Sequence, residues 1–257
     1  MAISAVRLAV VLLVLVANVF GLDVGIQSGC PKHLVSCAEG ANTNTINTCC
    51  APEYGLVVLD LKWMFGLGPE DKFVISGLQA ATCNGHLAPE NGCNPKRAIN
   101  DIGKRLNDSG TDLYDYIKTY WTIGTNKKAD RHWEHAWLQY GTCMTNLESE
   151  CQGNQGTEAQ SVLNYFIAAR SLHEKYDVVQ ALAESNIEPG TSISTSDMRK
   201  AIEDSFGTPV VMHCSNSVLD GVQVWFKVRG GGEFEATDPS SSAKQCKSKM
   251  ITFSRKM

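Results

Sequence analysis

Residues 132–143 read HWEHAWLQYGTC. Their aromatic and apolar residues recur at helical spacing, which predicts a helix over His132–Tyr140. On that helix, positions 135, 136, 139 and 140 share one side, whereas Glu134 lies about 200° from Ala136 around the axis. Trp133 and Trp137 are expected in the core or in a pocket wall.

The two histidines of this helix are the first candidates for a metal site. His132 and His135 are three residues apart, so both rings could face one ion. No third ligand is evident, and a position on the helix surface is the favoured interpretation. The sequence therefore predicts neither a metal nor another cofactor.

The first 21 residues have the composition of a secretory signal peptide. Met1–Arg7 carries one positive charge, Leu8–Val16 is wholly apolar, and Ala17–Gly21 supplies small residues before a cleavage expected at Leu22. The apolar run is shorter than the about 20 residues that a membrane span needs. Without Arg7 the chain has 22 basic and 27 acidic residues, a net charge of −5, which disfavours a general nucleic-acid-coating protein.

Cysteine usage agrees with an extracellular location. The ten cysteines all follow the leader, and an even number in a secreted chain predicts five disulfides, whose pairing the spacing leaves open. Cys49 and Cys50 are expected to have different partners, because a bridge between neighbours is strained. Asn107 begins the glycosylation signal Asn107-Asp108-Ser109, which implies a surface loop if it is used.

Periodicity predicts an α+β domain over residues 22–257. Buried strands are expected over Tyr54–Trp63 and Phe73–Leu78, and Val222–Val228 alternates like a strand with one buried face, followed by a glycine turn and a return over Phe234–Thr237. Helices are expected over Ala98–Leu106, Leu113–Tyr120, His132–Tyr140 and Glu158–Tyr176, and from a cap near Ser194–Asp197 to Gly207. Residues 247–257 are expected to form a flexible basic tail.

Two segments resemble the active-site segments of the ribonuclease T2 family. Phe73–Ala81, which reads FVISGLQAA, resembles FTIHGLWPD, and the 132–143 stretch resembles WEHEWxKHGTC. Cys49–Leu59, which reads CCAPEYGLVVL, is similar to the fungal branch. The resemblance extends from about Cys30 to Cys246 and implies a central antiparallel sheet flanked by helices. It also implies the disulfides Cys30–Cys50, Cys37–Cys83, Cys49–Cys151, Cys93–Cys143 and Cys214–Cys246.

The same resemblance implies that most of the catalytic set is missing. Family members cleave RNA by attack of the ribose 2′-OH on the neighbouring phosphate, which requires a base, an acid and positive charge at the phosphate. Of the family's residues for these roles, only one histidine persists, as His135. The other histidine positions hold Ser76 and Tyr140, the glutamate position holds Ala136, and the lysine position holds Gln139.

The base pocket implied by the resemblance is changed as well. Gln79 and Ala81 stand where the family has a tryptophan and an aspartate, and Leu87 stands where it has a tyrosine. Aromatic stacking is worth about 1–3 kcal/mol per base, so recognition is weakened together with the chemistry. Ser76 lacks the G-x-S-x-G context of a serine nucleophile and is interpreted as a small polar replacement.

These losses favour a secreted ribonuclease T2-like pseudoenzyme that acts as a monomeric, effector-like binding protein without a membrane segment. Its partner would be an extracellular or host protein, or RNA held without cleavage. The alternative is a weak ribonuclease that uses His135 with His86 or Tyr140 as a stand-in, although an exposed loop position is favoured for His86. A storage or structural role is a third hypothesis. His33, His173 and His213 have no evident partners in the sequence.

Overall fold

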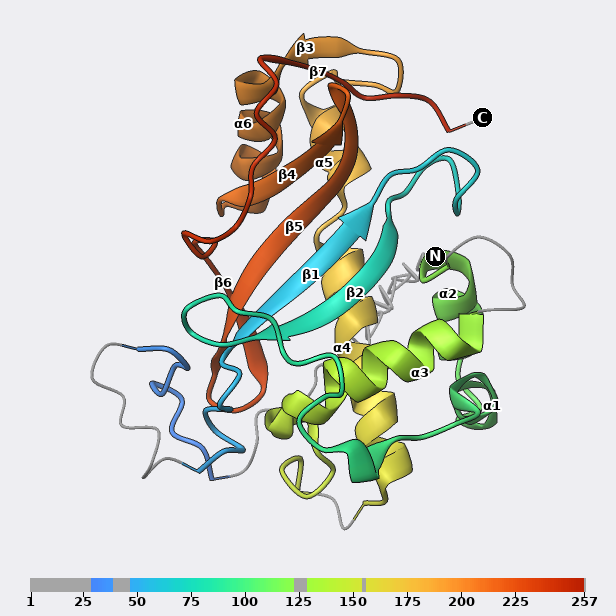
Figure 1. Cartoon of the computed structure of the whole chain (residues 1–257), viewed down its shortest axis with the longest axis vertical. Coiled ribbons are helices and arrows are strands. Elements are labelled where there is room, and N and C mark those ends of the chain that lie inside the picture. The colour runs from blue at the N-terminus through green and yellow to red at the C-terminus, as the bar shows by residue number, and fades with distance from the viewer. Residues whose placement is uncertain (1–28, 39–46, 123–128, 154–155, 257) are drawn as a thin grey trace, which may run out of the picture.

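The computed structural model describes residues 29–38, 47–122, 129–153 and 156–256. These residues form one mixed sheet with helices packed on one of its faces, which confirms the α+β prediction (Figure 1). The strand order is β2-β1-β5-β7-β3, with β4 and β6 also paired to β5. All pairings are antiparallel except a single parallel contact between β5 and β7.

The sheet is built on the strands β1 (Leu56–Lys62), β2 (Val74–Ala81) and β5 (Val218–Arg229). Alternate residues of β1 face opposite sides, as strand geometry requires. Val57, Leu59 and Leu61 enter the main core, whereas Leu56 and Val58 pack in a smaller cluster with Trp225. A bulge in β2 opposite Asp60 and Leu61 leaves Ser76 without a partner in the register.

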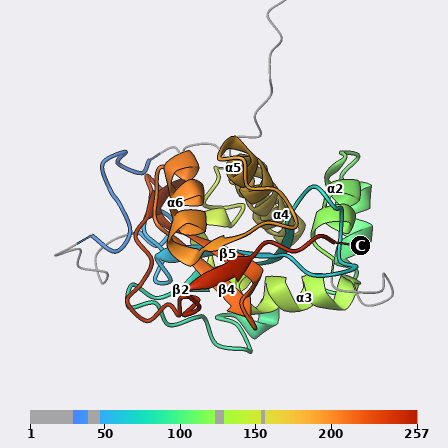
Figure 2. The same ribbon diagram turned by 90° about the horizontal axis from the view of Figure 1, so that it is seen from above.

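The predicted helices are all present with ends shifted by up to four residues, and the short helix over Val178–Glu184 was not predicted. Their bounds are α1 (Ile102–Asp108), α2 (Leu113–Tyr120), α3 (Ala129–Gln139), α4 (Glu158–Lys175), α5 (Val178–Glu184) and α6 (Thr195–Phe206). Helices α4, α5 and α6 lie on the same side of the sheet in both views (Figures 1 and 2). Helix α6 begins as predicted, because the Ser194 hydroxyl accepts a hydrogen bond from the Asp197 amide at 3.1 Å.

The remaining strands are β3 (Ser192–Ser194), β4 (Val210–Ser215), β6 (Glu233–Thr237) and β7 (Met250–Thr252). The expectation of a flexible tail over 247–257 is wrong for its described part. Strand β7 pairs with β3, and Ile251 and Phe253 are fully buried in the core. The burial of these two side chains outweighs the basic character of their neighbours.

All five predicted disulfides are present, and their pairing is the one implied by the family resemblance. Cys49 and Cys50 have different partners, Cys151 and Cys30. Asn107 is exposed near the end of α1. The predicted signal peptide lies outside the described residues, and within them no helix is long and apolar enough to cross a membrane.

Candidate functional site

The residues assigned to catalysis by the resemblance come from two elements, strand β2 and helix α3. Ser76 is half-buried at the β2 bulge. Helix α3 and the short turn Gly141–Cys143 that follows it both contact β2. The tertiary structure therefore brings the two sequence segments together at one end of the sheet.

Tyr140, at the position where the resemblance implies the second family histidine, lies directly after α3. Its ring lies near Gly77, because a Cβ built on that glycine would be 3.9 Å from Cε2 of Tyr140 and 3.4 Å from Cγ of Gln79. Burial, reinforced by the carboxylate of Asp60, raises the pKa of the Tyr140 phenol above its usual value of 10. This phenol therefore holds its proton throughout the neutral range and does not act there as a base.

Asp60 is a buried carboxylate beside this site that sequence inspection missed. It is 5% exposed and pairs across the sheet with Gly77 on one side and Gln223 on the other. The Gln223 side-chain amide donates a hydrogen bond to Asp60 at 3.1 Å. The alternation of β1 could have indicated it, since an aspartate interrupts the apolar run LVVLDLK.

Two further positions of the catalytic set face the interior. Ala136 is 3% exposed and belongs to the main core, where the Tyr165 hydroxyl lies 3.4 Å from its carbonyl oxygen. Gln139 is 9% exposed, and its side-chain amide donates to the Ala88 carbonyl at 3.4 Å. Neither side chain carries a charge, so neither supplies a proton or neutralises a phosphate.

The two histidines of α3 have different environments. His135 is exposed. His132 is partly buried, which corrects the expected position on the helix surface, and its Nε2 is enclosed without a hydrogen-bond partner in the described part of the chain. Burial lowers the pKa of His132, His135 lowers it further, and the Ser76 backbone acts in the opposite direction. The ring of His132 therefore lies close to the position where the family places its first histidine.

Glu134 has a partner away from this site. Its carboxylate accepts a hydrogen bond from the Asp101 amide at 2.8 Å, at the start of α1. Asp101 has a left-handed backbone, with φ of 62°. Glu134 thus joins α3 to the beginning of α1 and points away from the catalytic positions, in the direction that helical geometry predicts.

The base-pocket positions lie along β2 and the turn that follows it. Gln79 is half-buried, while Ala81 is fully buried and forms an isolated bridge with Leu87. Leu87 is 47% exposed. His86 is exposed in the same turn, where its backbone is bonded to Thr82. The surface has an aliphatic side chain where the resemblance implies a stacking aromatic ring.

Comparison with known proteins shows the family of this chain. Residues 41–246 match the model of the Ribonuclease T2 family, and ribonuclease Rh of Rhizopus niveus is 34% identical over 217 residues, covering 84% of this chain and 89% of the relative. The chain belongs to the ribonuclease T2 family. Ribonuclease Trv of Hypocrea rufa is 29% identical over 227 residues, covering 84% of this chain and 94% of the relative.

Solved structures of ribonuclease T2 proteins share the fold. The crystal structure of the T2 ribonuclease Actibind has a TM-score of 0.77 at 23% identity and covers 89% of this chain and 96% of that one. Human RNase T2 has a TM-score of 0.58 at 17% identity, covering 79% of this chain and 99% of that one. At these identities the likeness shows the fold alone.

Proposed function

We propose that this ribonuclease T2 family member is a secreted protein that has lost RNA cleavage and acts by binding. The observation that carries the proposal is the position of the Tyr140 phenol, which lies beside Gly77 and within electrostatic range of Asp60. A phenol with a raised pKa stands there in place of an imidazole. The transesterification then lacks a group that exchanges a proton near neutral pH.

The uncharged positions on α3 support the same conclusion. Ala136 and Gln139 replace the carboxylate and the ammonium group, and both side chains are buried. Each positioned acid or base typically contributes about 10²–10⁴ to a rate, and loss of one transition-state donor costs about a further 10²–10³. These effects overlap within one catalytic unit, yet even a part of them removes ordinary ribonuclease activity.

The proposed location and partners rest on the disulfide framework that the chain retains. Five disulfides hold the fold in an oxidising environment, which supports an extracellular role. RNA bound without cleavage, or a protein outside the cell, fits a scaffold that keeps its framework and loses its chemistry. We include in this proposal that the bound partner belongs to a host or a competitor, on which the protein acts as an effector.

A weak ribonuclease is the second candidate, because the named relatives in this family are ribonucleases. His135 is exposed and accessible to a phosphate. Of the stand-ins expected from the sequence, His86 lies in the turn after β2, and Tyr140 has a raised pKa. His132 is a third possibility, close to Ser76, but its enclosed Nε2 does not face solvent.

The test compares the purified natural protein with a variant that carries Ser76→His, Ala136→Glu, Gln139→Lys and Tyr140→His. Cleavage of a fluorogenic RNA is measured from pH 4 to pH 8. We expect background rates for the natural protein and an increase of at least about 10³ in the restored variant. His135→Ala in each background is the control.

Two results separate the candidates. Cleavage by the natural protein that His135→Ala abolishes would establish the weak ribonuclease. Background rates in the natural protein, with activity in the restored variant that His135→Ala removes, support a sound scaffold without a working site.

A further inference from the structure

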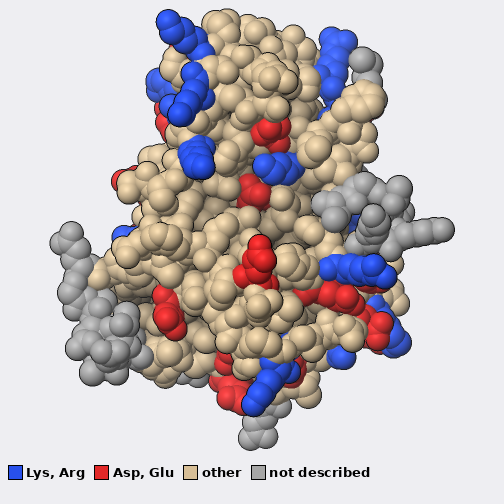
Figure 3. All heavy atoms as spheres, viewed as in Figure 1, with Lys and Arg blue, Asp and Glu red and all other residues tan. Residues whose placement is uncertain are grey.

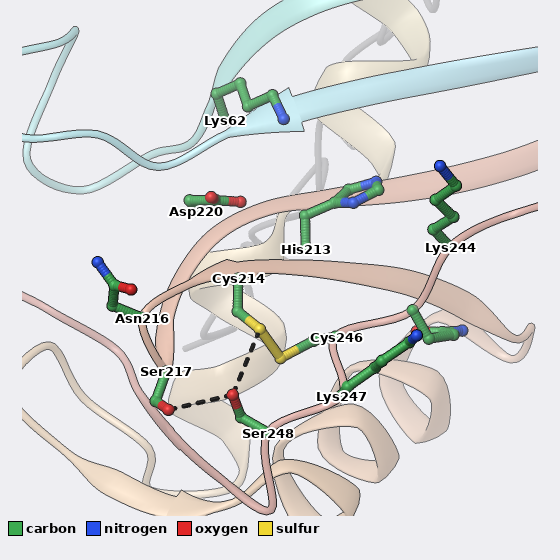
Figure 4. Close-up of a pocket in the computed structure, with 11 residues that line it drawn as sticks. Lys62, His213, Cys214, Asn216, Ser217, Asp220, Lys244, Cys246, Lys247 and Ser248 are labelled. Atoms are coloured by element: carbon green, nitrogen blue, oxygen red, sulfur yellow. Dashed lines mark hydrogen bonds between the residues drawn. A yellow bond between two sulfur atoms is a disulfide. The ribbon is translucent and has the colours of Figure 1, made fainter.

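A polar cavity lies on the face of the sheet opposite α4, beyond the C-terminal end of β1. The upper part of the surface in Figure 3 shows more Lys and Arg than Asp and Glu side chains. The cavity has a volume of about 570 Å³ and is bounded by β1, the β4–β5 hairpin and residues 244–248 (Figure 4). Its lining includes Lys62, His213, Lys244 and Lys247, and a single carboxylate, Asp220. Three ammonium groups and one carboxylate give the cavity an excess of two positive charges, in a chain whose net charge is −4.

The register of the sheet creates a gap between two of these groups. Lys62 pairs with Gly221 on β5, and Gly221 pairs on its other side with His213 on β4. The strand between the two side chains therefore presents a bare backbone. A Cβ on Gly221 would lie 3.1 Å from Nζ of Lys62, so the missing side chain lets the ammonium group lie over the strand toward His213.

The two lysines of the opposite wall are held by the segment between them. The Met212 amide donates to the Gln245 side chain at 3.0 Å, and the Cys246 amide donates to the Met212 carbonyl at 2.7 Å. The Cys214–Cys246 disulfide fastens the same segment to β4. Lys244 and Lys247 thus extend from a fixed backbone, which reduces the ordering cost of binding a ligand.

Several polar groups of the cavity have no partner among the residues that the structure describes. Lys62, Lys244 and Lys247 form no ion pair with any residue that the structure describes. Nε2 of His213 is buried and has no hydrogen-bond partner in the same set of residues. In Figure 4 the ring of His213 lies between the ends of Lys62 and Lys244. Buried polar groups in folded proteins are normally paired, so this cavity has the features of a site that a ligand completes.

We propose that this cavity binds a phosphate group, held by Lys62, His213 and Lys244, with Lys247 adding long-range attraction. Ammonium groups and a ring N–H form short, charge-assisted hydrogen bonds with phosphate oxygens. This inference goes beyond the proposed function, because it concerns a separate set of residues and does not depend on whether RNA is cleaved. The phosphate belongs either to a free phosphate or nucleotide, or to the backbone of single-stranded RNA.

The position of the cavity connects it to the candidate site. Lys62 and Asp60 lie on the same face of β1, two residues or about 7 Å apart. Asp60 in turn raises the pKa of Tyr140. An RNA strand bound beside Tyr140 can therefore continue along this face into the cavity.

Binding measurements on matched variants test the proposal. The ligands are inorganic phosphate and 5′-AMP, followed by calorimetry, and a labelled single-stranded ten-nucleotide RNA, followed by fluorescence anisotropy. The test variant is Lys62→Gln with Lys244→Gln. The control, Lys96→Gln with Lys118→Gln, removes the same charge from exposed positions elsewhere. A third variant, Lys62→Arg with Lys244→Arg, keeps the charge and reports on misfolding.

We expect at least tenfold weaker phosphate binding in the test variant, a change below twofold in the control, and affinity within about threefold of the natural protein in the arginine variant. If RNA is the source, its affinity falls in parallel, and the slope of log K against log salt falls by about 1.4, or about 0.7 for each ammonium group. Weaker binding of phosphate and 5′-AMP alone assigns the site to a free ligand. Equal losses in the test and control variants would overturn the proposal. So would the absence of phosphate binding by the natural protein at about 10 mM, tenfold above a millimolar dissociation constant.

Discussion

The Tyr116 hydroxyl lies 2.8 Å from Nδ1 of His173, and Nε2 of the same ring lies 2.8 Å from the Phe73 carbonyl oxygen. A carbonyl accepts only, so Nε2 carries the proton and Nδ1 accepts from the hydroxyl. This neutral imidazole joins α2, α4 and the residue before β2. These two partners could not be predicted from the sequence, because they come from segments far from His173 in the chain.

The buried His173 makes stability depend on pH. Burial lowers its pKa from 6.5 to about 4, so the unfolded chain takes up the proton first as the pH falls. The contribution of neutral His173 to the free energy of unfolding is fully present above about pH 6.5. It is lost progressively as the pH falls toward 4, and it amounts to about 3 kcal/mol. We expect His173→Gln to reduce the slope of unfolding free energy against pH in this window, measured with urea. His33→Gln, at an exposed position, should leave the slope unchanged; equal slopes in all three proteins would refute the assignment.

The C-terminal segment is expected to contribute to stability through Lys256. Its ammonium group donates to the carbonyls of Pro69 and Lys72 at 2.9 and 2.7 Å and lies 4.2 Å from the centre of the Trp63 ring. We expect Lys256→Met to lower the unfolding free energy by about 2 kcal/mol, because two carbonyls lose a charged donor. The exposed Lys249→Met is the control. A loss no larger than that of the control would mean that the end of the chain is not held by these bonds.

Two disulfides at the same corner of the fold should contribute unequally to the free energy of unfolding. Cys49–Cys151 spans 102 residues and Cys30–Cys50 spans 20. Loop-closure entropy in the unfolded chain predicts losses of about 5 and about 3 kcal/mol when each pair is replaced by serine. Thermal and urea unfolding of the two double variants give the ranking. The reverse order would indicate that native-state contacts, rather than chain entropy, set the contribution.

Glu134 is predicted to act in folding and not in catalysis. Glu134→Ala removes the carboxylate that accepts from the Asp101 amide, and we expect a loss of about 1–2 kcal/mol, with a smaller loss for Glu134→Gln, which keeps an acceptor. In the restored quadruple variant, Glu134→Gln should change RNA cleavage by less than twofold. A drop comparable to that of His135→Ala would instead make Glu134 a participant in the reaction.

Local patterns predicted the elements whose burial repeats along the chain. Leu113–Tyr120 is helical over its full predicted length, and the alternation of Val222–Val228 matches the buried face of β5. The run Leu56–Lys62 forms the predicted strand. The apolar residues of these segments repeat with the period of a helix or a strand, so the local sequence is enough to predict their structure.

Strands β4 and β7 show where local patterns fail. Val210–Ser215 is a short run without a clear period, and Met250–Thr252 lies among lysines. Each becomes a strand because a partner pairs with it, β5 for the first and β3 for the second. Pairing of this kind depends on tertiary neighbours, which short windows of sequence do not contain.

The sequence by itself determined the family and, through the family resemblance, the five disulfide pairs, because these depend on residue type and order. Only the tertiary structure decided that Tyr140 lies beside Gly77 and near Asp60, and that Lys62 and His213 face one another across Gly221. Those residues are distant in the chain, and the register of neighbouring strands sets their positions. A cross-strand gap is a property of pairing geometry, which no single segment encodes.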